Sequence, residues 1–483
     1  MRLSNTILTQ LPPAVARPPY DRSRVAPGIV HLGLGAFARA HLAVYTDSAL
    51  AAGETAWGIT GASLRSPATR DALAPQDGLY AMAVRDADGE RLRVIGAVAR
   101  VLAAPADTSA VILAMADART RIVSLSVTEK GYCHDPATGA LNEDHPGIRH
   151  DAVTRELPRS MPGLVAAALA MRRARGIPPF TVLSCDNVPG NGGVTKRVLT
   201  RFAGLLNAEL ERYLDDHLFC PSTMVDRIVP ATTDDDRARI SAALGCEDAW
   251  PVVTEPFSQW VIEDDFPLGR PDWAAHGAVL VHDVALHEAM KLRLLNGAHS
   301  ALAYLASLAG FETVADAMAE PGLSGFIERL MQHEIIPVLS APHGADVEAY
   351  ARSLLARFRN RALKHRLAQI AMDGSQKLPQ RLLATARERL SRGLPLPCVA
   401  LGIAGWMRHV SSTAELRDPM AAELRRRADA AGPDAGRLVL ALLDIESIFG
   451  RDLPADPRFV TAVTVALQLL DRNGILAALN AAS

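Results

Sequence analysis

The sequence is poor in cysteine, has no long apolar run, and carries no excess charge of either sign. Its five cysteines are far apart and none has C-x-x-C spacing, so neither a disulfide framework nor a structural zinc site is predicted. This usage fits the reducing cytoplasm, where we expect the protein. A net charge of -2 favours neither a nucleic-acid nor a membrane partner. No run reaches the roughly 20 apolar residues that span a bilayer, and the N-terminus lacks the apolar core of a signal peptide.

Several catalytic signatures are also missing. The sequence contains no G-x-S-x-G, H-E-x-x-H or G-x-x-x-x-G-K-[ST] motif, and no paired Cys/His ligands. A zinc-dependent alcohol dehydrogenase therefore has little support, and we expect no metal. The expected partner is a small molecule, and the chain is expected to be a monomer or a simple homo-oligomer.

The pattern of apolar and polar residues changes at about residue 284. Before it, short apolar runs alternate with helical stretches, which predicts a mostly parallel sheet covered on both faces. After it, strand-like runs nearly vanish and amphipathic helical segments follow. The 483 residues suffice for two or three domains. We predict an α/β domain over 1–284 and a mainly α-helical domain over 285–483, with a site at their junction.

The expected elements follow from the same patterns. Strands are predicted at 28–32, 57–64, 80–84, 94–98, 122–127, 180–184, 251–254 and 278–281. Helices are predicted at 36–51, 109–119, 161–175, 194–214, 286–309, 312–338, 346–358, 378–392, 401–410 and 436–449.

A glycine turn follows the first predicted strand. It reads Gly33-x-Gly35-x-x-Ala38 and opens a helix with Ala36 and Phe37. Dinucleotide sites use this geometry: the first glycine makes the turn, the second lets the pyrophosphate approach, and a small third residue lets the helix pack. A purely structural turn is the alternative. The context favours a Rossmann-type cofactor site.

The end of the second strand bears on which cofactor is bound. NAD enzymes often place an acid there to accept from the ribose hydroxyl. Here the stretch Ser63–Pro67 contains no acid, and Arg65 could face the 2′-phosphate of NADP. A solvated loop arginine explains it equally well.

A stretch of apolar helix carries four polar groups. At about 100° per residue, Glu288, Lys291, Asn296 and His299 fall within an arc of roughly 140°. Alcohol oxidation needs a base, which a buried lysine supplies, and donors that hold the oxyanion, which an amide and an imidazole supply. Glu288 could relay protons or pair with Lys291. The alternative is a salt-bridged helix start with a solvated lysine and a satisfied core histidine.

Three further segments can be interpreted either as part of a ligand site or as purely structural. Asn187 follows an apolar strand, where open α/β sheets place ligands, or it closes an ordinary Asx turn. Asp226 and Arg227 lie inside an apolar run, as a buried ion pair or a site. The run from Asp373 through Lys377 is by itself a good helix start.

Together these segments resemble the mannitol dehydrogenase family, the long-chain polyol-specific dehydrogenases. The resemblance covers nearly the whole chain and rests on six motifs in this order: Ile29–Phe37, Thr128–Tyr132, Ser184–Asn187, Met224–Ile228, Lys291–His299 and Asp373–Pro379. It implies a Rossmann-type domain and a helical domain, NAD or NADP, and no metal.

The resemblance also implies roles for individual residues. The lysine matching Lys291 is the family's general base, and the residues matching Asn296 and His299 polarise the reacting oxygen. Those matching Asn187, Asp226 and Lys377 line the nicotinamide and sugar pocket.

The substrate depends on residues elsewhere in the helical half. Mannitol-type members tend to have an arginine where this chain has Gln369, and the run 364–381 resembles the fructuronate reductase (mannonate oxidoreductase) branch. An aldonate needs a cation for its carboxylate, and Arg293, Arg366 and Arg381 are the candidates.

The hypothesis is therefore an NAD-dependent oxidoreductase that interconverts D-mannonate and D-fructuronate. The alternatives are a mannitol 2-dehydrogenase, another polyol or aldonate (tagaturonate) dehydrogenase, or a ligand sensor without turnover.

Overall fold

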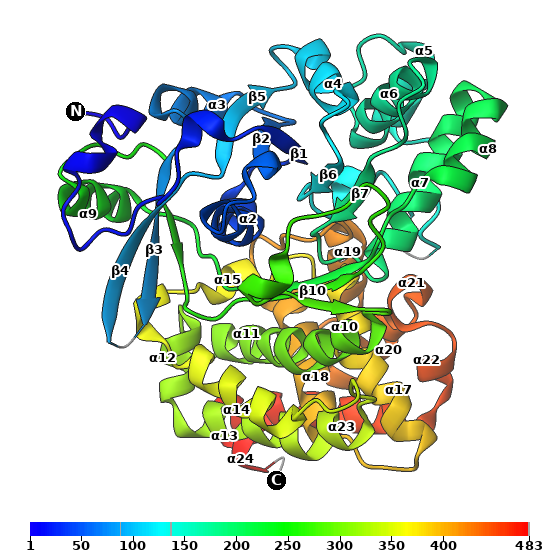
Figure 1. The fold of residues 1–483 in the computed structure, drawn as a ribbon. Coiled ribbons are helices and arrows are strands. Elements are labelled where there is room, and N and C mark those ends of the chain that lie inside the picture. Colours follow the sequence, from blue (N-terminus) through cyan, green and yellow to red (C-terminus); the bar gives the residue numbers. More distant parts are fainter. Residues whose placement is uncertain (87, 136–137, 482–483) are drawn as a thin grey trace. The chain divides into compact units, whose positions relative to one another are not determined.

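The computed structural model describes residues 1–86, 88–135 and 138–481, and its contacts divide the chain into two compact units. Unit 1 is Met1–Ala285 and unit 2 is Leu286–Ser483 (Figure 1). Each unit is described by itself. No helix of the described residues combines the length and the apolar character needed to cross a membrane.

A five-stranded parallel sheet forms the centre of unit 1, in the order β5–β2–β1–β6–β7 (Figure 1). Its strands are β1 (Pro27–Leu32), β2 (Gly58–Ser63), β5 (Val98–Ala103), β6 (Ile122–Leu125) and β7 (Thr181–Ser184). Successive residues of a strand point to opposite faces, and both faces are apolar here. Val30 and Leu32 enter one buried cluster and Ile29 another. The predicted α/β architecture is confirmed.

Two small mixed sheets complete unit 1, and the sequence did not reveal them. One contains β8 (Thr223–Asp226), β10 (Gln259–Glu263) and β11 (Val279–Val281); the other contains β3 (Tyr80–Asp86), β4 (Gly89–Ile95) and β9 (Val252–Thr254). The strand predicted at 94–98 is wrong. It is the end of β4, the two connecting residues Gly96 and Ala97, and the start of β5, all within one buried apolar run.

Nine α-helices lie in unit 1 among the described residues. They are α1 (Ala36–Ala40), α2 (Leu42–Ala51), α3 (Ala68–Leu73), α4 (Thr108–Ala116), α5 (Pro146–Val153), α6 (Met161–Ala174), α7 (Asn191–Leu206), α8 (Ala208–His217) and α9 (Asp234–Leu244). The helix predicted at 194–214 is two helices, because extended Asn207 interrupts it and caps α8.

The helix predicted at 36–51 is also two helices. His41, at φ -124° and ψ -91°, separates α1 from α2. The break frees carbonyl groups that a continuous helix would satisfy. The Tyr80 hydroxyl donates to the Arg39 carbonyl at 2.7 Å, and Arg227 Nη1 donates to the Ala40 carbonyl at 2.6 Å.

The regular elements of unit 2 are all helices among its described residues. Its α-helices are α10 (Ala285–Lys291), α11 (Ala298–Leu308), α12 (Val314–Ala319), α13 (Pro321–Arg329), α14 (Val347–Phe358), α15 (Leu367–Ile370), α16 (Gly374–Leu378), α17 (Ala384–Ser391), α18 (Pro397–Ser412), α19 (Ala421–Ala431), α20 (Ala435–Leu443), α21 (Glu446–Phe449), α22 (Asp452–Ala455), α23 (Pro457–Asn473) and α24 (Ile475–Ala481). One large apolar cluster, with α11 and α18 packed at its centre, holds them together.

Three segments of unit 2 are π-helical: η7 (Leu292–Gly297), η8 (Leu330–Ile335) and η11 (Pro379–Leu383). Segments η7 and η11 pack against each other. A Cβ on Gly297 would lie 3.0 Å from the Arg381 carbonyl oxygen, so this contact requires a glycine or a small shift. Single π-turns inside helices are rare and are frequent at functional sites.

Glu334, at the end of η8, is the buried anchor of α18. Its carboxylate accepts the amides of Cys398 at 2.6 Å and Val399 at 2.9 Å, and burial raises its pKa.

We expect Glu334→Ala to lower the free energy of unfolding by about 2–4 kcal/mol, because two buried amides at a helix start lose their acceptor. Urea denaturation measures this. Glu328→Ala, at an exposed position of α13, is the matched control, and an equal loss in both variants would contradict the expectation.

Candidate active site

The glycine turn lies at the topological switch point of the parallel sheet. β1 has β2 on one side and β6 on the other, and ligands bind at the carboxyl edge of such a sheet. Gly33 has φ +91°, and a Cβ there would lie 2.1 Å from the Ser126 carbonyl oxygen. Gly35 is exposed, so the backbone is open to a ligand at this point. The turn therefore fits the pyrophosphate of a dinucleotide.

The other residues predicted around the cofactor lie on the elements that follow this turn. Ala36 and Phe37 begin α1, and the Phe37 ring stacks on His41 with centroids 5.0 Å apart. Arg65 follows β2 and is exposed. Its position at the end of the second strand is where the adenosine ribose is recognised in this fold.

Asn187 follows β7 of the five-stranded sheet, and Asp226 ends β8 of a small mixed sheet. Asn187 is exposed just beyond β7, and Asp226 is the buried last residue of β8. Asn191, at the start of α7, links the segment after β7 to the start of β8. Its side chain donates to the carbonyls of Asp186 at 3.0 Å and Thr223 at 2.8 Å, and it accepts the Thr223 amide at 2.9 Å.

Arg227 has a structural role in this chain. Besides the Ala40 carbonyl, it donates to the Glu255 carbonyl at 3.0 Å. Burial lowers its pKa to about 10. The side chain thus ties the break between α1 and α2 to the segment that precedes β10.

In unit 2, the base and oxyanion candidates flank a π-turn. Lys291 ends α10, Asn296 lies in η7, and His299 begins α11. All three are buried, with relative exposures of 5%, 8% and 7%, so the alternative of a solvated lysine does not describe this chain. Glu288, one turn earlier, is partly buried.

The π-turn changes the geometry assumed for a regular helix. In an α-helix, residues five apart point in directions about 140° apart. A π-helix bonds residue i to i+5, so Lys291 and Asn296 come onto the same side. The face is therefore narrower than a uniform 100° per residue predicts.

His299 is held by two rings. It stacks on Phe358 with centroids 4.0 Å apart and meets the His365 ring edge-on at 5.4 Å. Burial holds its pKa well below the usual range, and His365, Arg357 and Arg381 lower it further. The imidazole is therefore neutral near pH 7. Its Nε2 is buried without a hydrogen-bond partner among the described residues.

The three arginines proposed for a substrate carboxylate have different surroundings. Arg381, in η11, donates through Nη1 to Ser300 Oγ at 3.0 Å and is one of the cations that act on His299. Arg293 is partly buried and interacts with Glu388 and Arg392. Arg366 is exposed. Only Arg381 is tied by these contacts to the helix that carries His299.

Lys377 and Gln369 lie on consecutive short helices. Lys377 Nζ, on α16, donates to the carbonyls of Met372 at 2.6 Å and Ile370 at 3.3 Å. Gln369, on α15, is exposed. The ammonium group therefore fixes the turn between α15 and α16, in which Asp373 has a left-handed φ of 56°.

The sequence did not point to several residues that shape these sites. Asn191 had no motif of its own, and Phe358, His365 and Arg357 meet His299 from segments 58 to 66 residues away in the sequence. His365 lies within the run 364–381 that resembles the fructuronate reductase branch, and this position could have suggested it. The other residues are brought to the site by packing between segments distant in the sequence, which local motifs do not predict.

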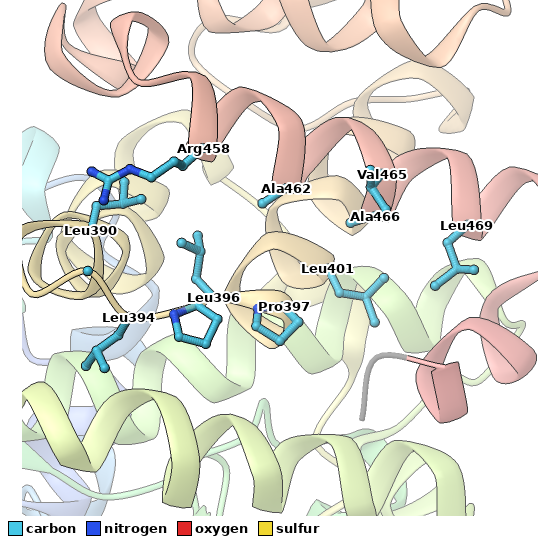
Figure 2. Close-up of a pocket in the computed structure, with 12 residues that line it drawn as sticks. Leu390, Leu394, Leu396, Pro397, Leu401, Arg458, Ala462, Val465, Ala466 and Leu469 are labelled. Carbon is cyan, nitrogen blue, oxygen red and sulfur yellow. The ribbon is translucent and has the colours of Figure 1, made fainter.

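Two other observations limit where the site lies. An apolar groove of about 520 Å³ in unit 2 is lined by Leu394, Pro397, Leu401 and Val465, with Arg458 at one end (Figure 2). It contains none of the candidate residues. No group of three or more metal-ligating side chains is arranged to hold an ion in the described ranges.

Comparison with known proteins agrees with a Rossmann-type unit followed by a helical unit. A family model for the mannitol dehydrogenase Rossmann domain matches residues 27–275, and one for the mannitol dehydrogenase C-terminal domain matches residues 283–471.

Individual relatives match along nearly the whole chain. A D-mannonate oxidoreductase of Escherichia coli is 45% identical over 95% of this chain and 96% of its own length. A mannitol 2-dehydrogenase of Pyrenophora tritici-repentis is 42% identical over 96% of this chain and 83% of its own. The structure of Pseudomonas fluorescens mannitol 2-dehydrogenase in complex with NAD and D-mannitol is 38% identical, with a TM-score of 0.92 over 100% of this chain and 99% of that one. The chain therefore belongs to the mannitol dehydrogenase family and is an oxidoreductase of that family.

Proposed function

We propose that this enzyme interconverts D-mannonate and D-fructuronate with NAD, and that Lys291 exchanges the proton with the reacting oxygen. The observation that carries the chemistry is the burial of Lys291, Asn296 and His299 around one π-turn. An ammonium group, an amide and an imidazole are costly to bury together unless they are used or paired.

Each side chain has a distinct task in this proposal. A dinucleotide held at Gly33 and Gly35 would supply the hydride acceptor for oxidation of the alcohol carbon and the hydride donor for the reverse reduction. Lys291, as the neutral amine, takes the hydroxyl proton in oxidation, and as ammonium it supplies that proton in reduction. The Asn296 amide and the neutral His299 ring each donate an N–H to the oxygen as charge develops on it.

The proposed cofactor site lies in unit 1. Gly33 and Gly35 admit the pyrophosphate, and Ala36 and Phe37 begin the helix beside it. Asn187 and Asp226 are proposed to line the nicotinamide end. NAD is proposed before NADP because the homologous NAD complex supports it; exposed Arg65 is the residue that would serve NADP.

The proposed substrate is an aldonate. Arg381 supports this choice because it lies close enough to His299 to act on its pKa, and a guanidinium group suits a carboxylate. Gln369 adds support, since mannitol-type members tend to have arginine there. Lys377 is proposed to contact the sugar. The mannitol 2-dehydrogenase relatives keep a neutral polyol as the alternative.

A turnover screen tests the substrate directly. We expect the purified enzyme to oxidise NADH fastest with D-fructuronate, more slowly with D-tagaturonate and least with D-fructose, measured by absorbance and repeated with NADPH. Turnover of fructose but of neither keto-uronate would contradict the aldonate proposal. Absence of turnover with all three would contradict the proposed function.

Lys291→Ala tests the base. We expect kcat to fall by about 10²–10⁴-fold, the usual contribution of general acid–base catalysis, while NADH binding, measured by fluorescence titration, is retained. Lys196→Ala on α7 is the matched control and should keep wild-type kcat. Near-normal turnover by Lys291→Ala would remove Lys291 from the mechanism.

Arg381→Lys tests the carboxylate ligand. Lysine keeps the charge but loses the bidentate fork, so kcat/KM for fructuronate should fall about tenfold or more. The loss for fructose should be smaller. Arg293→Lys and Arg366→Lys test the rival ligands, and exposed Arg361→Lys is the control. A larger selective loss in either rival would reassign the carboxylate site.

A further inference from the structure

A chain segment borders the glycine turn of the proposed dinucleotide site, on which the proposal below rests. The Ser126 amide donates to the Leu32 carbonyl at 2.9 Å and continues the pairing of β1 with β6. The Ser126 carbonyl then lies against Gly33, where a Cβ would clash. The segment that starts at Ser126 is therefore one wall of the proposed cofactor site.

Asp186, just after the neighbouring strand β7, binds the segment that starts at Ser126. Its two carboxylate oxygens accept the successive amides of Val127 and Thr128, each at 2.9 Å. The Tyr132 hydroxyl donates to the same carboxylate at 2.8 Å. Asp186 is itself fixed, since the Asn191 side chain donates to its carbonyl. The carboxylate thus spans the segment from beginning to end.

Thr128 is strained within this segment. Its φ of 64° and ψ of 164° lie in a region that is essentially restricted to glycine. A β-branched residue persists there only when its surroundings impose the conformation. The bond from its own amide to Asp186 is a contact that does so. Such outliers cluster at ligand sites, where the strain keeps a binding geometry in place.

We infer that Asp186 is a positioning residue that holds 126–132, including strained Thr128, in the conformation that binds the dinucleotide. Asp186 acts through this segment and not by contact with the reacting atoms. An asparagine of the same size could accept with one oxygen only, and its NH₂ group would face a backbone N–H.

The ionisation of Asp186 provides an additional readout. Burial raises the pKa of its carboxyl to about 6, against the hydrogen bonds from Val127, Tyr132 and Thr128 that lower it; Glu129 adds to the rise. The ionisable groups that face it are Tyr132 and Glu129 from the 129–132 turn and the Cys185 thiol from its own strand end. Protonation below about pH 6 removes an acceptor, so NADH affinity should fall there.

The experiment measures NADH dissociation constants by fluorescence titration in four proteins: wild type, Asp186→Asn, Thr128→Gly and the double variant. We expect Asp186→Asn to weaken NADH binding about tenfold and to lose the change in affinity near pH 6. The double variant should regain part of the affinity, because glycine adopts this conformation without a clamp. Asp215→Asn, exposed on α8, is the control and should bind as the wild type does.

The outcomes separate the inference from the proposed function. If the wild type binds neither NADH nor NADPH, the proposed function fails and the inference fails with it. If the wild type binds and Asp186→Asn binds equally well, only the inference is overturned. It is also overturned if Asp186→Asn weakens binding only in proportion to a lower melting temperature and Thr128→Gly restores nothing, since Asp186 would then support folding alone.

Discussion

Irregular backbone in both units leaves polar groups that regular helices and strands would satisfy, and the fold depends on side chains that bind them. Arg227 takes the carbonyl freed at the break between α1 and α2, and Lys377 takes two carbonyls in the turn before α16. Asp186 takes two consecutive amides beside the glycine turn. A buried backbone group without a partner costs about 1–3 kcal/mol. Charged side chains in these places therefore act first as backbone ligands.

This constraint explains why charged side chains lie at several irregular segments that also carry proposed site residues. The break after α1, the turn before α16 and the segment beside the glycine turn are each bound by an ionisable side chain. Lys377 and Arg381 therefore have two roles each. Lys377 binds local backbone carbonyls and Arg381 contacts α11, and both are proposed to contact the substrate. Substitutions there change geometry as well as charge, so conservative variants are more informative than alanine.

The sequence was sufficient for the architecture and for the family. Alternation of apolar runs and helices predicted the parallel sheet, and the motif predicted a glycine turn after its first strand. The position of Gly33 at the switch point follows from the strand order, which the sequence did not give. The boundary between β4 and β5 was missed because the connecting residues Gly96 and Ala97 lie inside an unbroken apolar run. The breaks at His41 and in η7 were missed because helical periodicity assumes one repeat throughout. The surroundings of His299 depend on packing between distant segments, which no local pattern encodes.

The π-turn between Lys291 and His299 has a consequence for how this site varies among sequences. A π-turn differs from an α-helix by one extra residue within the turn. If 292–297 kept all of its residues but became α-helical, Lys291 and Asn296 would point about 140° apart, although every side chain were still present. If one residue between them were deleted together with the π-turn, they would lie four apart, about 40° from each other on a regular α-helix, and would stay on one side. The spacing of the three residues is thus as much a part of the chemistry as their identity.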